Sequence, residues 1–545
     1  MSDTVVNAPY SQQAAHLVAK VDQDRWGSVR PSLYETARVI SAAPWLPGEP
    51  GRIAYLLNEQ SSDGSWGEGP ERYRLLPTLS AVEAALAVLL RGTTATPAET
   101  TRRLATAVDR GLAALRALPP AGPWPDTAAA EILVPSLVAR INEQLPLIAD
   151  NASSVDNRTP VPDSWRPGPQ LALPHGYDRA LPEYAAKRYA SAGGLPVKLH
   201  HTFEGIAAYI PQTLVPDRPD LLGSSPAATA ARAATAPTSP SAGTVAALES
   251  VARRYAGSFP EAAPILVFER LWVAAALARA GLPAVSLPTV RRWAAEIYDP
   301  RGVRGAPGLM TDADDTAMAV LVSSLVGLPH GPEPLDRFHN GSHYDCYIGE
   351  DTGSVTANAH ALQALGAHQR RHPGAERTYG PRTDKLRDWL VGQQRPEGTW
   401  PDKWHASPYY ATARCVSTLK QYGGQYGADH AATAVETAVA WTVDTQRDDG
   451  SWGVWGGTAE ETAYAAQILL SAAEHRPQHA RALHRAETYL NGVPNTGHHP
   501  ALWHDKTLYA PGAMIEAEVL AVRELLRTRP RPSGRETTTP TDAER

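Results

Sequence analysis

The sequence predicts an all-α fold built from repeated helices, and three observations support this prediction. Segments rich in Ala, Leu, Glu and Arg, such as 79–91 and 101–118, carry apolar residues at i, i+3, i+4 and i+7. No convincing pair of alternating strand patterns appears. Turns rich in Gly, Pro and Asp separate the helical segments at fairly even intervals, as in an array of helical repeats.

Three of these turns are variants of one pattern that begins with Gln, contains Gly and ends with Trp. They lie at 60–66, 394–400 and 446–452. The Gly permits a tight turn after a helix, the acidic residue can cap, the Trp packs against a helix, and the Gln bonds free backbone groups. We therefore interpret the turns as structural rather than catalytic.

Composition narrows the function classes. At 545 residues the chain is too long for one ordinary domain, so two or more large domains are expected. The net charge of −6 gives no electrostatic case for binding nucleic acid or an anionic membrane. Cys346 and Cys415 lie far apart in no metal-ligand spacing, which fits a reducing cytosol. Because we find neither an apolar signal core nor a membrane-spanning apolar run, we expect a cytoplasmic protein without a transmembrane segment.

Three carboxylates fall within four residues at Asp312, Asp314 and Asp315, immediately before the apolar run 317–326. Isolated carboxylates resist desolvation, so such a cluster is costly. Proteins accept that cost where one carboxyl must stay protonated as an acid while its neighbours hold it. The alternative is a helix N-cap, which Asp favours, but a cap explains one or two of the three groups.

The acid cluster together with the Gln-to-Trp turns resembles the class II terpene cyclases, whose acid motif is Asp-x-Asp-Asp. More narrowly, the chain resembles the bacterial diterpene cyclases of the copalyl diphosphate synthase type. Further segments match this family in the same order along the chain, namely 32–37, 131–137, 199–205, 225–230, 268–272 and 503–509.

The resemblance implies two α/α-barrel domains, called β and γ, with γ inserted after the first helix of β and the active site between them. Residues 1–28 would then begin β, 29–261 would form γ and 262–529 would complete β. The polar segment 530–545 is expected to be a disordered tail.

A trisubstituted alkene is a very weak base, so its protonation requires a strong, fixed acid in a dry site. Asp314 resembles the general acid of the family, and Asp312 and Asp315 would orient it and tune its acidity. The carbocations that follow need walls that stabilise charge without bonding to it, as aromatic faces do. Candidate pocket residues in matched segments are Trp272, Tyr344, Tyr347 and Thr356, with ordinary core packing as the alternative.

A prenyl diphosphate also needs cations. Lys403 and Arg279 fall where plant relatives place diphosphate-binding residues, and Lys187 with Arg188 is a further candidate; the alternative is a solvated surface role. Asp126 and Glu131 resemble a magnesium-binding motif of bacterial relatives, so Mg²⁺ is the expected cofactor. Mg²⁺ prefers one or two carboxylates plus phosphate oxygens and water, although a capping box would also explain this pair.

His201 lies where plant ent-copalyl relatives carry the His of a His–Asn pair, which holds the water that removes the final proton. At the expected place of the Asn this chain has Glu261. A carboxylate is a stronger base than an amide and would hold a histidine charged. Either a His201–Glu261 pair orders the water differently, or the base lies elsewhere and the product is not of the ent series; a solvated Glu at a Pro-rich turn is the alternative.

We therefore expect a class II diterpene cyclase that converts geranylgeranyl diphosphate to a copalyl-type diphosphate. The diphosphate should be retained, because the chain lacks the Asp-Asp-x-x-Asp run of class I enzymes. The alternatives are drimenyl diphosphate formed from farnesyl diphosphate, a clerodane or hydroxylated labdane diphosphate, and, outside enzymes, a helical-repeat binding module. The partners considered are a downstream class I terpene synthase and a second copy of the chain.

Overall fold

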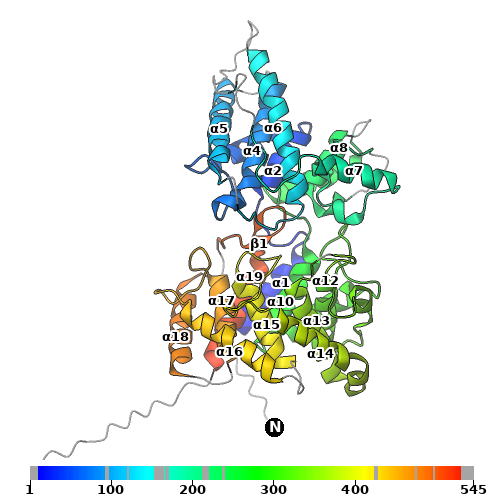
Figure 1. Cartoon of the computed structure of the whole chain (residues 1–545), viewed down its shortest axis with the longest axis vertical. Coiled ribbons are helices and arrows are strands. Elements are labelled where there is room, and N and C mark those ends of the chain that lie inside the picture. Colours follow the sequence, from blue (N-terminus) through cyan, green and yellow to red (C-terminus); the bar gives the residue numbers. More distant parts are fainter. Residues whose placement is uncertain are drawn as a thin grey trace, which may run out of the picture.

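The structure is a computed structural model that describes residues 10–529, apart from internal gaps at 93–96, 120–121, 153–164, 166–170, 212–219, 236–239, 351, 423–427, 473–475 and 495–496. The predicted tail 530–545 lies outside the described residues. Figure 1 shows two helical bodies, one above the other, joined by a narrow region around the strand β1.

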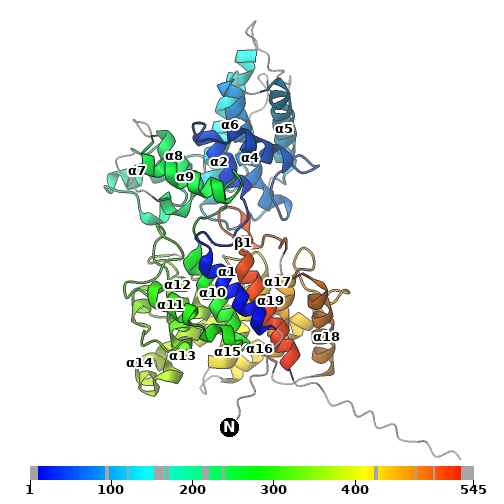
Figure 2. The ribbon, with the colours of Figure 1, turned by 180° about the vertical axis from the view of Figure 1, so that it is seen from behind.

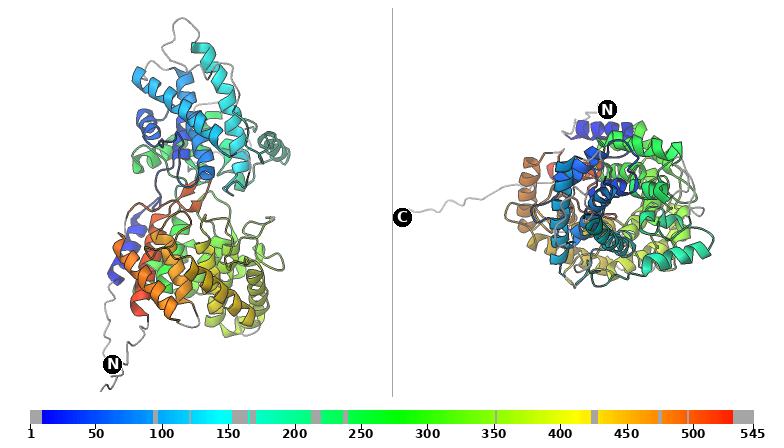
Figure 3. Two further views of the ribbon diagram at one scale, coloured as in Figure 1. Left: turned by 60° about the vertical axis from the view of Figure 1, so that its left-hand side comes forward. Right: turned by 90° about the horizontal axis from the view of Figure 1, so that it is seen from above.

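The lower body is a closed ring of six helices, which we call the barrel. Each contacts the next and the last contacts the first. The ring consists of α10 (Leu266–Arg279), α12 (Ala313–Leu325), α13 (Val355–Arg371), α15 (Pro408–Tyr422), α17 (Ala459–Leu470) and α19 (Gly512–Thr528). Outside it lie α1 (Ser11–Gln23), α11 (Pro288–Ile297), α14 (Glu376–Gly392), α16 (Ala428–Asp444) and α18 (Pro477–Gly492). Two concentric layers of helices confirm the α/α-barrel class (Figure 3).

The upper body, which we call the N-terminal lobe, is organised around one almost wholly buried helix, α4. Its neighbours α2, α5 and α6 cover it on three sides. The helices of the lobe are α2 (Leu33–Ala42), α3 (Glu49–Asn58), α4 (Leu75–Arg91), α5 (Ala98–Ala117), α6 (Ala130–Ala152), α7 (Leu181–Ser191), α8 (Pro226–Thr235) and α9 (Ala242–Arg254). Short 3₁₀ helices complete the chain: η1 (Glu71–Arg74), η3 (Val197–Leu199), η4 (Phe203–Gly205), η6 (Leu222–Ser224), η7 (Pro283–Ser286), η8 (Glu333–Phe338) and η9 (Pro373–Ala375).

The first helix belongs with the barrel rather than with the lobe. Figure 2 shows α1 beside α10 and α19, and the buried residues of α1 share one hydrophobic core with these helices. The core around α4 is separate. The division of the chain at residues 28, 261 and 529 stays a prediction.

Two helical stretches, Glu71–Arg91 and Ala130–Ala149, are long and apolar enough to cross a membrane by composition. Core helices of soluble proteins pass the same test, and 83 % of the apolar window in the first stretch is buried inside the protein. The apolar surface of this helix is therefore used for packing in the N-terminal lobe.

The Gln-to-Trp turns are structural, as predicted. In the first turn, the Gln60 side-chain amide donates to the carbonyl oxygens of Gly64 and Ala107, at 2.9 Å each. The buried Trp66 indole donates to the Leu56 carbonyl at 2.8 Å. A Cβ on Gly64, whose φ is +89°, would lie 2.6 Å from the carbonyl oxygen of Arg110, so only glycine fits this turn. The turns at 394–400 and 446–452 repeat these bonds.

A small hairpin joins the two bodies. It consists of β1 (Trp503–His504) and β2 (Leu508–Tyr509), paired antiparallel. Each strand has two residues, too few to produce the alternating pattern from which strands are predicted, so this hairpin was not expected. Between the strands the chain carries Lys506 into the N-terminal lobe, where its side chain is fully buried.

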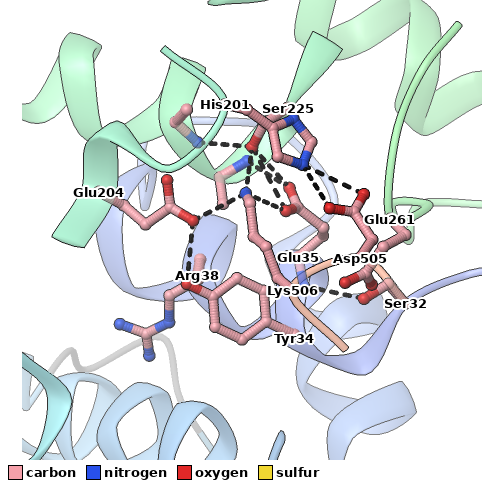
Figure 4. A network of polar contacts seen from close by, with 12 residues as sticks. Ser32, Tyr34, Glu35, Arg38, His201, Glu204, Ser225, Glu261, Asp505 and Lys506 are labelled. Atoms are coloured by element: carbon pink, nitrogen blue, oxygen red, sulfur yellow. Dashed lines mark hydrogen bonds and ion pairs between the residues drawn. The ribbon is translucent and has the colours of Figure 1, made fainter. Parts of the chain in front are cut away.

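Lys506 is the centre of a buried polar network shown in Figure 4. Its ammonium donates to Glu35 at 2.6 Å, to Glu204 at 2.8 Å and to Ser225 at 2.7 Å. Burial raises the pKa of Glu35 to about 8, against the opposing effect of Lys506. A second donor, the backbone N–H of Ala227, lies 2.6 Å from Glu35 and favours its ionised form. One lysine of the hairpin thus binds two carboxyl groups of the lobe.

We predict that Lys506→Met destabilises the protein strongly, because it leaves Glu35 and Glu204 buried without their cation. Breaking a buried ion pair by removing one partner typically costs about 3–5 kcal/mol. Urea denaturation measures the change in unfolding free energy. The matched control is Lys20→Met, whose partner Glu516 is at the surface of the barrel and whose loss should cost no more than about 1 kcal/mol. Equal losses in the two variants would contradict this role of Lys506.

Candidate active site

The acid cluster lies where the ring helix α12 begins. Asp312 is the N-cap, and its side chain accepts a hydrogen bond of 2.7 Å from the backbone N–H of Asp315. The capping interpretation is therefore correct for Asp312, but it leaves the other two carboxyl groups unexplained. Asp312 and Asp315 are both buried.

The two buried carboxyl groups hold protons tightly. Burial raises the pKa of Asp312 well above its ordinary value, and the adjacent carboxyl of Asp315 raises it further. Burial likewise raises the pKa of Asp315 to about 7. A Cβ on Gly305 would lie 2.8 Å from Asp315 Oδ2, so a glycine permits this close approach. The pair therefore carries less than its full negative charge near neutral pH.

Asp314 differs from its two neighbours because its side chain keeps 16 % of its surface exposed. Its Oδ1 lies 2.6 Å from Nδ1 of His360, a buried residue of α13. Sequence reasoning missed His360. The available signal was its position four residues after Thr356, which places both side chains on the same face of one helix.

Aromatic side chains surround this acid–histidine pair. Trp272 of α10 packs edge-on against His360 with ring centroids 5.3 Å apart, and its indole donates to the Tyr410 hydroxyl at 2.9 Å. Phe268 lies 4.4 Å from Trp272, and Trp503 of β1 lies 4.7 Å from Tyr410, both between ring centroids. Trp272 thus lies beside the histidine that contacts the acid, and its role as a pocket wall stays a prediction. Tyr410 and Trp503 are additions from the structure.

The two candidate tyrosines have different surroundings. Tyr344 is buried against His339, with ring centroids 5.1 Å apart, which favours the core-packing alternative. Tyr347 is half-buried, and Lys198 of the lobe lies 5.3 Å from its ring centroid. Burial and nearby acidic groups, among them Asp312, raise its pKa, so Tyr347 lies near the acid cluster and faces the lobe.

Thr356 supports a fourth carboxyl group near the acid. Its hydroxyl donates to Asp402 at 3.0 Å, and burial raises the pKa of Asp402 to about 7. The nearby carboxyl group of Asp314 contributes to that rise, so Asp402 lies close to the acid cluster.

Lys403 lies beside the hairpin. Its ammonium forms an ion pair with Glu350, and its backbone carbonyl lies 2.9 Å from Nδ1 of His504 in β1. Burial lowers the pKa of His504 to about 4, so this histidine is neutral. The other ring nitrogen of His504 bonds the hydroxyl of Tyr73 in η1 at 3.0 Å. Lys403 is therefore placed where the barrel meets the lobe.

The predicted cation clamp needs correction, because the structure does not bring Arg279 to Lys403. Arg279 is the last residue of α10, about 20 Å along the helix from the end that meets the lobe. Its guanidinium bonds Glu518 of α19 at 2.8 Å, and Arg414 bonds the same carboxylate. A buried carboxylate holds its cations tightly, so this geometry favours a structural role for Arg279.

The other predicted cations are at the surface. Lys187 and Arg188 are exposed on α7, and Lys187 pairs with Glu183 of the same helix at 2.6 Å. This agrees with the solvated alternative for the pair.

The predicted magnesium ligands are both exposed. Burial raises the pKa of Tyr73, and the nearby Asp126 raises it further. Asp126 also has a raising effect on the pKa of His504. It therefore lies close to the part of the hairpin that contacts Lys403. Glu131 lies in the first turn of α6. Among the described residues no group of three or more His, Cys, Asp or Glu could hold a metal ion alone. Exposed carboxylates of this kind are ligands that Mg²⁺ accepts together with phosphate oxygens and water, and Mg²⁺ binding at this pair stays a prediction.

The predicted pairing of His201 with Glu261 is also wrong. His201 Nε2 lies 2.9 Å from Asp505 in the hairpin, and its Nδ1 lies 2.7 Å from the carbonyl oxygen of Gly223. Glu261 accepts hydrogen bonds from the backbone N–H and the hydroxyl of Thr507, at 2.6 Å and 2.9 Å. It is 1 % exposed, which also contradicts the solvated alternative. Glu261 anchors the hairpin.

Comparison with known proteins assigns the family. Residues 344–512, within the barrel, match the squalene-hopene cyclase C-terminal domain. The chain is 77 % identical to a copalyl diphosphate synthase of Streptomyces anulatus, over 100 % of this chain and 97 % of the relative. The chain belongs to the bacterial class II diterpene cyclases. A labda-7,13-dienyl diphosphate synthase of Streptomyces clavuligerus is 49 % identical over 95 % of this cyclase and 94 % of the relative.

A solved structure agrees with this assignment. The ent-copalyl diphosphate synthase of Streptomyces platensis superposes with a TM-score of 0.86 at 39 % identity, covering 95 % of this cyclase and 99 % of that chain. The predicted family, fold class and enzyme class are therefore confirmed.

We predict that Asp315→Asn stabilises the cyclase at pH 8 but much less at pH 5. The pKa of Asp315 rises from about 4 in the unfolded chain to about 7 in the folded protein. The folded state binds this proton more tightly, so wild-type stability falls as pH rises through that window, by an amount on the order of a few kcal/mol. Asn does not ionise and avoids the loss. Thermal unfolding at the two pH values measures the difference.

The matched control is Asp299→Asn. Hydrogen bonds from Arg301 hold the pKa of Asp299 at about 2, so this carboxyl is ionised at both pH values and its replacement should have the same effect at each. A stability change for Asp315→Asn that does not vary between pH 5 and pH 8 would show that Asp315 titrates normally.

Proposed function

We propose that this cyclase protonates geranylgeranyl diphosphate at its terminal alkene, closes two rings and releases a copalyl-type diphosphate with the diphosphate group retained. The observation that carries the proposal is the placement of Asp314. Of the three clustered carboxyls it is the most exposed, it is bonded to a buried histidine, and it is surrounded by aromatic rings. The names of the Streptomyces copalyl diphosphate synthases support the choice of product.

The first step is a proton transfer from Asp314. His360 occupies Oδ1, so the acidic proton is carried by Oδ2. The O–H bond breaks, the alkene π pair forms a new C–H bond, and a tertiary cation remains on the substrate. An N–H of His360 stabilises the carboxylate left behind, while the protonated Asp312–Asp315 pair adds little opposing charge.

The aromatic rings then hold the cation. Trp272, Tyr410 and Trp503 present π surfaces that attract positive charge without forming a bond to it. Their burial also excludes water, which would otherwise capture the cation. Ring closure by the remaining alkenes needs no further protein group.

The diphosphate would lie beside Lys403, the predicted cation that the structure places where barrel and lobe meet. Its ammonium forms an ion pair with Glu350. Asp126 and Glu131 would contact a Mg²⁺ carried by the diphosphate, which would offset the charge of that group. The retained diphosphate makes the product suitable for a class I terpene synthase, the downstream partner we propose for this cytoplasmic enzyme.

The second candidate product is labda-7,13-dienyl diphosphate, favoured by the relative from Streptomyces clavuligerus. It arises from the same bicyclic cation by loss of a different proton. The two candidates therefore share every step assigned to Asp314 and differ only in the last one.

We predict that Asp314→Asn abolishes turnover without unfolding the protein. Loss of a general acid costs about a hundred- to ten-thousandfold, and a base as weak as an alkene puts this variant at the upper end. Purified protein is incubated with geranylgeranyl or farnesyl diphosphate and Mg²⁺, and the dephosphorylated products are identified by mass spectrometry. Circular dichroism checks the fold. Activity within tenfold of wild type would remove Asp314 from this role.

We predict that the hydrogen bond from His360 to Asp314 contributes to kcat, and the variants His360→Asn and His360→Phe test this. Asn keeps an N–H donor for Asp314 and Phe does not, so Phe should lower kcat further than Asn. A hydrogen bond to a charged group is worth about 1.5–3 kcal/mol, or roughly ten- to a hundredfold in rate. Equal kcat values for the two variants would argue that His360 acts only by filling space.

We predict that Lys403→Ala raises KM more than it lowers kcat, because the diphosphate is bonded equally in the ground state and the transition state. The matched control is Lys187→Ala, an exposed lysine with its own carboxylate partner, which should leave KM unchanged. If Lys403→Ala also leaves KM unchanged, the diphosphate binds elsewhere.

A further inference from the structure

Both ring nitrogens of His201 face hydrogen-bond acceptors, and Figure 4 shows the contact with Asp505. Nδ1 lies 2.7 Å from the carbonyl oxygen of Gly223, which can only accept. Nε2 lies 2.9 Å and 3.1 Å from the two carboxylate oxygens of Asp505. A neutral imidazole has only one N–H, so it cannot donate to both partners. The geometry therefore allows two forms, an imidazolium beside an ionised Asp505 or a neutral imidazole that accepts from a protonated Asp505; the charges around the pair favour the first.

The electrostatics agree with this ion pair. Burial opposes the charge on His201, yet the field of Asp505 raises the histidine pKa above its ordinary value. Burial also opposes the charge on Asp505, but His201 and then Lys506 lower its pKa. An imidazolium has no free lone pair, so His201 cannot itself accept a proton and can act only through a neighbouring group.

The pair opens onto the space between barrel and lobe. The side chains of His201 and Asp505 are 12 % and 18 % exposed, whereas that of the adjacent Lys506 is 0 % exposed. Tyr509 in β2 is close to both this pair and the acid cluster: burial raises its pKa, and carboxyl groups that include Asp505 and Asp315 raise it further. Asp505 therefore belongs to the same interior region as the acid, at its lobe side.

We propose that the carboxylate of Asp505, oriented by the imidazolium of His201, accepts the proton that leaves in the last step of cyclisation. The inference rests on the proposed function. The C–H bond next to the final cationic carbon breaks, its electron pair forms the new C=C bond, and the proton bonds to Asp505. One proton enters from Asp314 and one leaves to Asp505, so no oxidant, reductant or co-reactant is needed.

Position, rather than base strength, determines which group can act. A C–H bond beside a carbocation is extremely acidic, so even a carboxylate with a lowered pKa is basic enough. His201 occupies both oxygens of Asp505, which makes the carboxylate less prone to add to the cation as an ester. Two other carboxyl groups lie nearby, but both are buried: Glu261 is bonded to Thr507 and Glu35 to Lys506. Asp505 is therefore the accessible base.

The hairpin fixes the position of this base from both sides. The backbone carbonyl of Asp505 accepts a hydrogen bond of 2.9 Å from Ala128 of the lobe. Its neighbour Lys506 is held by Glu35 and Glu204. A base held in this way can meet one C–H bond of a bound cation in preference to others.

The test compares Asp505→Asn with His201→Gln by mass-spectrometric product profiling. Asn keeps the size of Asp505 but has no carboxylate, so the share of the normal olefin should fall at least tenfold in favour of hydroxylated or rearranged bicyclic products. Gln keeps a donor for Asp505 but has no imidazole, so the normal olefin should remain the main product at a lower rate. Persistence of the olefin in Asp505→Asn, or its loss in His201→Gln, overturns the proposal.

Glu261→Gln is the matched control for disturbance of the hairpin: its thermal midpoint should fall while its product profile stays normal. If Asp505→Asn is insoluble, Asp505→Ser replaces it in the comparison. Failure of this inference is distinguishable from failure of the proposed function. In the first case wild-type protein still forms a bicyclic diphosphate, and in the second it forms none.

Discussion

The structure depends on keeping three neighbouring carboxyl groups in a dry place without unfolding the helix that carries them. Asp312 solves part of this problem by capping α12, and it holds its proton because Asp315 lies beside it. Asp314 is then free to face His360 and the substrate space. The closed ring of helices supplies the apolar surroundings, and these make a carboxylic acid available near neutral pH.

The site also depends on the hairpin of β1 and β2. Three of its residues make contacts that the site needs. Trp503 joins the aromatic rings around the acid, Asp505 contacts His201, and Lys506 binds two buried carboxyl groups of the lobe. The acid therefore lies in the barrel, while the proton acceptor forms only where barrel and lobe meet. This arrangement separates the start of the reaction from its end and explains why both bodies are needed.

The sequence predicted what depends on local pattern. Helical periodicity revealed the all-α class, the Gln-to-Trp turns were interpreted correctly, and the acid cluster was found because three acidic residues precede an apolar run. Prediction from the sequence failed where contacts join distant parts of the chain. His360 bonds Asp314 from 46 residues away, and Asp505 bonds His201 from 304 residues away. No local pattern encodes such partners, which is also why Arg279 and Glu261 received roles that their actual partners do not support.

The most direct measurement of the central claim is turnover in D₂O. If Asp314 delivers a solvent-exchangeable proton to the alkene and the reaction ends by loss of a C–H proton, each product molecule gains one deuterium, at the carbon first protonated, and keeps its diphosphate. Mass spectrometry of intact and dephosphorylated product resolves both features. A product without solvent deuterium, or one released with free inorganic diphosphate, would contradict protonation as the initiating step.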